Sequence, residues 1–70
     1  MFKVWDILEG YYRRENVSFD ECKKLIAHYL DEEGIEDTFH EVLQVSTLEE
    51  LNDIAEIVDF EIERMDNHGI

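Results

Sequence analysis

The chain of 70 residues has no proline, three glycines and one cysteine, and each scarcity excludes a class of small protein. A single cysteine cannot form an internal disulfide, and no Cys/His cluster could hold a structural zinc, so stability must come from a packed core. No stretch rich in proline, glycine or serine reads as a linker. The length leaves room for one domain, residues 1–70.

Long apolar runs are also absent. None approaches the length of a membrane span, and the opening MFKVWDILEG contains acids, unlike a signal peptide. We therefore expect a cytoplasmic protein that makes no contact with a membrane. The apolar residues form 44% of the chain, which is enough for a folded core in spite of the charge.

Positive charge is scarce, because six Lys and Arg face nineteen Asp and Glu and leave a net charge of −13. In residues 1–30 five acids balance five bases, whereas residues 31–70 contain fourteen acids and Arg64 alone. The chain thus divides into a charge-neutral base and an acidic surface. Like charge disfavours direct binding to nucleic acid or an anionic membrane and favours a basic partner. Solubility alone would not require such segregation.

The neutral half is predicted to form two helices. Apolar side chains recur at helical spacing over residues 2–15: Val4, Trp5, Leu8, Tyr11 and Tyr12. The second helix begins after Ser18, whose spacing to Glu21 is that of a capping box, and it ends at Gly34. Residues 1–30 would therefore be a helical base.

The acidic half is predicted to form a strand, a helix and a strand. Residues 38–45 are rich in β-branched and apolar side chains, Ser46-Thr47 is a helix cap, and residues 58–64 alternate strictly. The expected fold is α+β: two N-terminal helices, then strand–helix–strand with a small antiparallel pair. An all-α alternative of three to four helices stays open, since residues 51–65 also fit a continued helix.

No catalytic or metal-binding motif is present. The histidines His28, His40 and His68 lie at no known ligand spacing, and no glycine-rich phosphate loop occurs. A calcium loop that starts at Asp31 would need a sixth-position glycine and a twelfth-position glutamate, but Val42 stands twelfth. We expect a protein that is not an enzyme and uses no cofactor or metal.

The acids themselves are the candidate binding residues. Three of them precede Gly34 at the C-terminal end of a helix, where the helix dipole disfavours negative charge, and such a choice points to function. Along the last predicted strand, acids on one face would repeat every ~6.6 Å, a spacing on the scale of successive phosphates. The candidates are Asp31, Glu32, Glu33, Glu36, Asp37, Glu49, Glu50, Asp53, Glu56, Asp59, Glu61 and Glu63.

The whole chain resembles the small acidic host-takeover proteins of lytic phages, in particular the DNA mimics with which Bacillus phages inhibit the bacterial histone-like protein HU. The resemblance lies in the length, the opening MFKVWDILEGYYRREN and the segments DEEGIED, STLEELNDIAE and VDFEIERMD. It implies that acids within 31–37, 49–56 and 59–63 occupy the DNA-binding arms and saddle of HU and exclude DNA.

We therefore expect a non-catalytic DNA mimic that inhibits a basic DNA-binding protein in the cytoplasm of a host bacterium and reaches the nucleoid through that partner. The resemblance alone names HU. An inhibitor of another DNA-binding enzyme, such as a nuclease or glycosylase, would use the same surface. An adaptor or homodimerisation module would instead use aromatic side chains of the neutral half: Trp5, Tyr11, Tyr12 and Tyr29.

Overall fold

Three strands form one antiparallel sheet in the order β2-β1-β3. The central strand β1 (Phe2–Asp6) pairs on one side with β2 (Tyr11–Val17) and on the other with β3 (Phe60–Arg64), so the first and last strands of the chain are neighbours. This computed structural model describes residues 1–65. The histidine His68 lies outside them.

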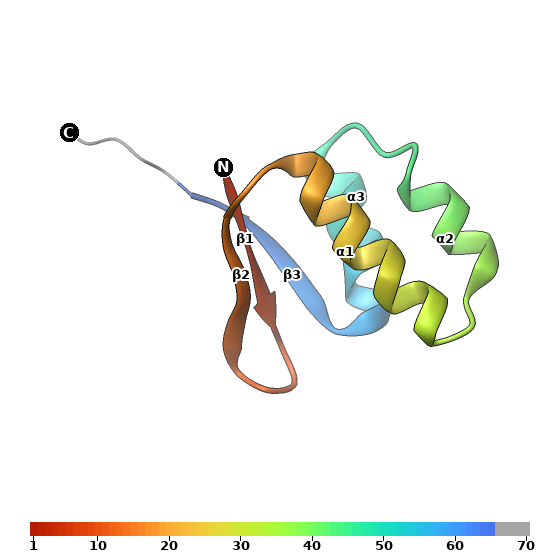
Figure 1. Ribbon diagram of the computed structural model, residues 1–70, viewed down its shortest axis with the longest axis horizontal. Coiled ribbons are helices and arrows are strands. Elements are labelled where there is room, and N and C mark those ends of the chain that lie inside the picture. The colour runs from red at the N-terminus through yellow and green to blue at the C-terminus, as the bar shows by residue number, and fades with distance from the viewer. Residues whose placement is uncertain (66–70) are drawn as a thin grey trace.

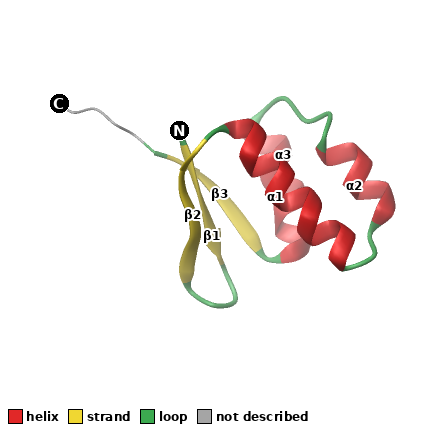
Figure 2. Ribbon diagram, viewed as in Figure 1, coloured by secondary structure: helices red, strands yellow, loops and turns green. Residues whose placement is uncertain are grey.

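The helices of residues 1–65 all lie on one side of this sheet, and the other face carries no helix (Figures 1 and 2). They are α1 (Phe19–Glu32), α2 (Glu36–Val42) and α3 (Leu48–Ala55), and a short 3₁₀ helix η1 (Glu56–Val58) leads from α3 into β3. Two of them, α1 and α3, pack on the sheet, and α2 packs against these two. The fold is therefore α+β with the order β-β-α-α-α-β. The predicted order of two helices followed by strand–helix–strand is wrong, and so is the all-α alternative.

The first predicted helix, residues 2–15, is a β-hairpin, so residues 1–30 are not a helical base. Two features defeat the helical pattern. Gly10 has a φ of 76°, which closes a four-residue turn that no helix accommodates. In β1 every second side chain faces the helices, but the third of these is Asp6, and a buried acid hides the alternation that marks a strand. The flanking aromatic and β-branched residues favour strands.

The predicted strand over residues 38–45 is also wrong, because this segment contains most of α2. Its β-branched composition misleads, since the apolar residues Ile35, Phe39 and Val42 recur at helical spacing and pack on the core. The last predicted strand, residues 58–64, forms only from Phe60 to Arg64, and it pairs with β1 instead of with residues 38–45.

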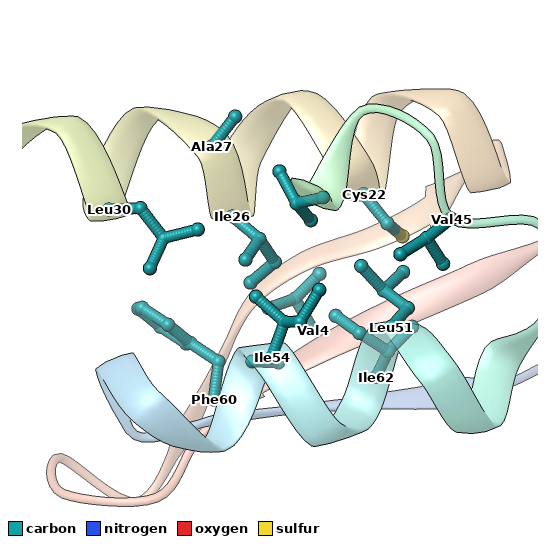
Figure 3. Packing of buried hydrophobic residues seen from close by; sticks show 12 residues of the cluster. Val4, Cys22, Ile26, Ala27, Leu30, Val45, Leu51, Ile54, Phe60 and Ile62 are labelled. Atoms are coloured by element: carbon teal, nitrogen blue, oxygen red, sulfur yellow. The ribbon is translucent and has the colours of Figure 1, made fainter. Parts of the chain in front are cut away.

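The other helix predictions are confirmed. The hydroxyl of Ser18 accepts a hydrogen bond from the Glu21 N–H at 3.1 Å and begins α1, and Thr47 caps α3 through the Glu50 N–H at 3.2 Å. Both helices turn their apolar faces onto the sheet (Figure 3). The resulting core comprises Val4, Cys22, Ile26, Ala27, Leu30, Val42, Val45, Leu51, Ile54, Ala55, Phe60 and Ile62.

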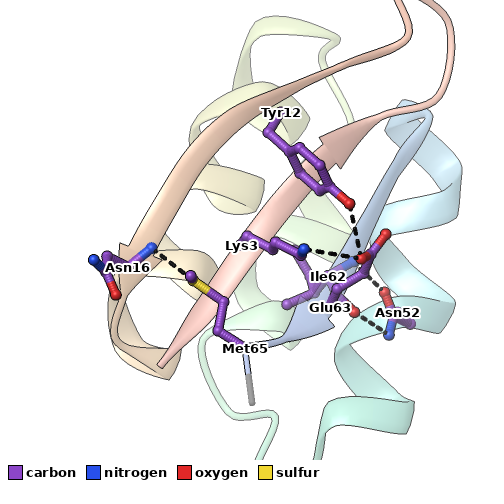
Figure 4. A network of polar contacts seen from close by, with 7 residues as sticks. All are labelled: Lys3, Tyr12, Asn16, Asn52, Ile62, Glu63 and Met65. Carbon is purple, nitrogen blue, oxygen red and sulfur yellow. Dashed lines mark hydrogen bonds and ion pairs between the residues drawn. The ribbon is translucent and has the colours of Figure 1, made fainter. Parts of the chain in front are cut away.

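The outer edge of β3 is occupied at its centre by a side chain of α3 (Figure 4). The Ile62 N–H donates to Asn52 Oδ1 at 2.7 Å, and Asn52 Nδ2 donates to the Ile62 carbonyl at 3.0 Å. A side-chain amide thus makes the two hydrogen bonds that a neighbouring strand would make at this residue. This pairing anchors α3 to the sheet.

Candidate protein-binding surface

The directions of the elements bring three acidic turns to one end of the molecule. Strand β1 and the helices α1 and α3 run toward this end, which is the lower side of Figure 1. The elements that follow them, β2, α2 and β3, run away from it. The turns are therefore residues 7–10, 31–37 and 56–59. We call their exposed carboxylates the acidic end: Glu9, Asp31, Glu32, Glu33, Glu36, Asp37, Glu56 and Asp59.

Direct contacts fix the three turns relative to one another. The Ile7 N–H donates to the Asp59 carbonyl at 3.0 Å, which joins the hairpin turn to η1. The rings of Tyr29 and Phe60 lie 4.7 Å apart and join the last turn of α1 to the start of β3. The Ile35 N–H donates to the Leu30 carbonyl at 2.9 Å and closes the turn between α1 and α2. The acids of this end therefore stand on a braced scaffold.

The electrostatic field at the acidic end is strongly negative. Two of the helices, α1 and α3 with η1, have their negative C-terminal ends here, and the positive N-terminal end of α2 offsets part of this contribution beside Glu36 and Asp37. Among residues 1–65, the ion pair that involves this end joins Glu32 Oε1 to His28 Nε2 at 3.6 Å, and it exists only when the histidine is protonated. The other carboxylates of the acidic end form no ion pair with any of residues 1–65.

The acids of α3 lie elsewhere. Glu49 and Glu50 are in its first turn, at the opposite end of the molecule, and the Glu50 carboxylate accepts a hydrogen bond from the Thr47 hydroxyl at 2.9 Å. Asp53 and Glu50 line a groove of about 430 Å³ between α2 and α3 together with Glu41. The sequence analysis did not include Glu41, because it placed residues 38–45 in a strand away from this helix.

The predicted row of Asp59, Glu61 and Glu63 does not form. Glu61 and Glu63 share the sheet face that carries no helix, but Asp59 precedes the strand in a left-handed conformation with a φ of 60°. The Glu63 carboxylate also accepts a hydrogen bond from the Tyr12 hydroxyl at 3.0 Å and lies 3.8 Å from Lys3 Nζ (Figure 4). Its charge is therefore largely compensated, unlike that of Glu61.

The aromatic side chains of the neutral half make internal contacts. Trp5 packs edge-on against Tyr12 with ring centroids 4.8 Å apart, Lys3 Nζ lies 4.5 Å from the Tyr12 ring, and Tyr29 lies against Phe60. Of the four aromatics, Tyr11 is the most exposed, at 47%.

Glu9 belongs to the acidic end although it lies in the neutral half of the sequence. Its position depends on Asp6, which is only 4% exposed. Asp6 Oδ1 accepts a hydrogen bond from the Glu9 N–H at 2.9 Å, and Arg13 Nε donates to Asp6 Oδ2 at 2.8 Å. These hydrogen bonds lower the pKa of Asp6 although burial opposes the shift, with the Glu9 backbone contributing most.

The lowered pKa of Asp6 predicts a specific pH dependence of stability. An acid whose folded pKa is depressed stabilises the fold above its unfolded pKa of about 3.9, and this contribution disappears as the pH falls through the folded pKa. We expect Asp6→Asn to lower the free energy of unfolding at pH 5–7 and the difference from wild type to shrink below about pH 4. Urea unfolding at each pH, followed by Trp5 fluorescence, measures this difference in the free energy of unfolding.

Asp20→Asn is the matched control, because the Asp20–Lys24 pair, at 3.4 Å, is exposed on both sides. Its effect should be small at every pH. A difference between wild type and Asp6→Asn that stayed constant from pH 6 to pH 2 would contradict the assigned role of the carboxylate.

Residues 1–65 contain no group of three or more Asp, Glu, His or Cys side chains placed to bind a metal ion. Within the same residues no helix combines the length and apolarity needed to span a bilayer. No family model matches the chain, and neither the curated proteins nor the solved structures contain a match.

Proposed function

We propose that the protein is a non-catalytic inhibitor that binds, through its acidic end, the DNA-binding surface of a basic host protein and keeps DNA away from it. The observation that carries the proposal is the gathering of uncompensated carboxylates on three turns braced against one another. The resemblance to phage DNA mimics names HU as the partner, which would place the protein in the bacterial cytoplasm and, through HU, at the nucleoid.

The mechanism is competition for the same cationic side chains. A nucleoid protein neutralises DNA phosphates with Lys and Arg, and much of its affinity comes from the release of counterions. A folded array of carboxylates presents comparable charge that is already held in place, so little conformational entropy is lost on binding. The field of a net charge of −13 also steers a basic partner toward the acidic end.

The test is a displacement titration with purified HU and a labelled DNA duplex. The protein should release the duplex, and its own affinity for HU should fall on the order of 10- to 100-fold when NaCl rises from 50 to 300 mM. An affinity that does not change with salt would exclude competition by charge. Direct binding of the protein to the duplex would exclude mimicry.

The identity of the basic partner can be tested in the same framework. A pull-down from bacterial lysate that recovers a nuclease or glycosylase instead of HU would keep the acidic end as the binding surface and change the target. An adaptor that works through the aromatic face is less well supported, since Trp5 and Tyr12 pack against each other and the Tyr12 hydroxyl is bonded to Glu63.

A further inference from the structure

The β1–β2 turn carries two large apolar side chains at its tip. Leu8 is 76% exposed, more than any other large apolar residue within 1–65, and Ile7 is 49% exposed. Turns that only connect strands usually carry polar residues and glycine, because nothing at the tip is buried on folding. Single exposed apolar residues are common, but two adjacent ones at the tip of a hairpin form a small patch.

This hairpin tip, residues 7–10, is held rigidly. The Glu9 N–H and Arg13 Nε both donate to the buried Asp6 carboxylate, and the Gly10 N–H donates to the Asp6 carbonyl at 2.8 Å. On the other side, the Ile7 N–H is bonded to the carbonyl of Asp59. A tip braced in this way needs little ordering when it binds, which favours affinity.

Carboxylates surround the apolar tip. Glu9 follows Leu8 in the turn, Asp59 is bonded to Ile7 through its backbone, and Glu56 lies in the same short helix as the half-exposed Ile57. An apolar centre with a charged rim is the usual anatomy of a protein-binding site, in which the centre carries most of the binding energy.

The rim determines what can cover the tip. A purely apolar partner would strip water from carboxylates without offering them counter-charges, which is costly. A second copy docked through the same end would bring Glu9, Glu56 and Asp59 against like charges. A basic surface with an apolar spot between its Lys and Arg side chains meets both requirements.

We propose that Ile7 and Leu8 are the anchor of this interface and insert into an apolar spot within the basic surface of the partner. This inference rests on the proposed function and assigns different roles in binding to the carboxylates and to the apolar tip. The carboxylates set the rate of association and its salt dependence, whereas the apolar tip slows dissociation.

The test compares two variants by surface plasmon resonance on immobilised HU. The double variant Ile7→Ser/Leu8→Ser should bind about 30-fold more weakly than wild type, mainly through faster dissociation, with the salt dependence of the association rate unchanged. Leu43→Ser is the matched control, since Leu43 is 45% exposed at the opposite end of the molecule, and it should bind within about twofold of wild type. The wild-type Trp5 fluorescence and Tm of both variants confirm folding.

Three outcomes would overturn the inference. Wild-type-like affinity of the double variant, with charge reversals at the acidic end still abolishing binding, removes the anchor but leaves the proposed function intact. Absence of any binding between the wild-type protein and HU removes both. Light scattering that shows a wild-type dimer converted to a monomer by Ile7→Ser/Leu8→Ser assigns the tip to a second copy instead.

Discussion

Replacing Glu32, Glu33 and Asp37 with lysine should lower the affinity for HU by about 100-fold or more, because it reverses charge where the three turns concentrate it. The expectation follows from the position of these acids and not from the net charge. Each is exposed, none of their side chains makes a capping hydrogen bond, and Glu33 and Asp37 have no ion pair within residues 1–65. Isothermal titration calorimetry at 50 mM NaCl measures the loss.

The control reverses the same amount of charge at the other end of the molecule. Glu15→Lys, Asp20→Lys and Glu49→Lys together change the net charge equally, so long-range steering declines equally. Affinity should then fall by no more than about fivefold, the steering contribution alone. If both triple variants lost affinity to the same degree, net charge and not the acidic end would be the determinant.

The double variant Glu32→Lys/Glu33→Lys should also be more stable than wild type; Asp37→Lys is left out of this comparison, because Asp37 stands in the first turn of α2, where the helix dipole favours an acid. Glu32 and Glu33 stand at the negative end of the α1 dipole, where lysine is favourable and glutamate is not. Thermal unfolding should therefore show a higher Tm together with the weaker binding. If these acids serve binding although they destabilise the end of α1, then replacing them should raise stability and weaken binding together.

Leu51→Ala should unfold a large part of the population. Leu51 is fully buried in α3, and truncation of a buried leucine costs about 2–5 kcal/mol through lost transfer energy and the cavity left behind. A domain of this length has a total stability on the order of only 4–10 kcal/mol, and here it must also overcome the repulsion among its acids. Urea unfolding monitored by circular dichroism gives the loss.

Cys22 provides an independent measure of the same unfolding. Its thiol is fully buried, and burial raises its pKa to about 11, so the folded protein should resist thiol reagents at pH 8. Labelling then reports transient opening, and it should accelerate by a factor on the order of 100 in Leu51→Ala. The control is Leu43→Ala, a truncation at an exposed position, which should leave the labelling rate near that of wild type. Equal labelling rates in wild type, Leu51→Ala and Leu43→Ala would contradict the expected destabilisation by Leu51→Ala.

Sequence reasoning succeeded where local signals and tertiary packing agree. The Ser18 and Thr47 caps each precede a regular apolar face, so α1 and α3 were predictable, and the strict alternation of residues 58–64 identified β3. It failed over the hairpin, because the buried Asp6 bonds to the partly exposed Arg13 across the turn, a contact that no apolar periodicity reveals. It failed again over α2, where β-branched composition outweighed the helical spacing of Ile35, Phe39 and Val42.

The same errors limited the candidate site. Charge segregation directed attention to residues 31–37, and the structure places them together because they span only the end of α1 and the start of α2. The contribution of Glu9 depends on chain direction in the sheet and could not be foreseen from a helix. The row through Asp59 failed because β3 begins at Phe60, two residues after the predicted start at residue 58, which leaves Asp59 in a turn.

The amide of Asn52 at the edge of β3 has a consequence for how copies of this chain can assemble. Growth of a continuous sheet from molecule to molecule requires two open edges on every copy. In the described chain the middle of one edge is already occupied by Asn52, so β2, the strand at the other edge, is the one left for pairing between copies. Strand addition between copies therefore ends after a single step, with a pair, and cannot propagate into a fibre.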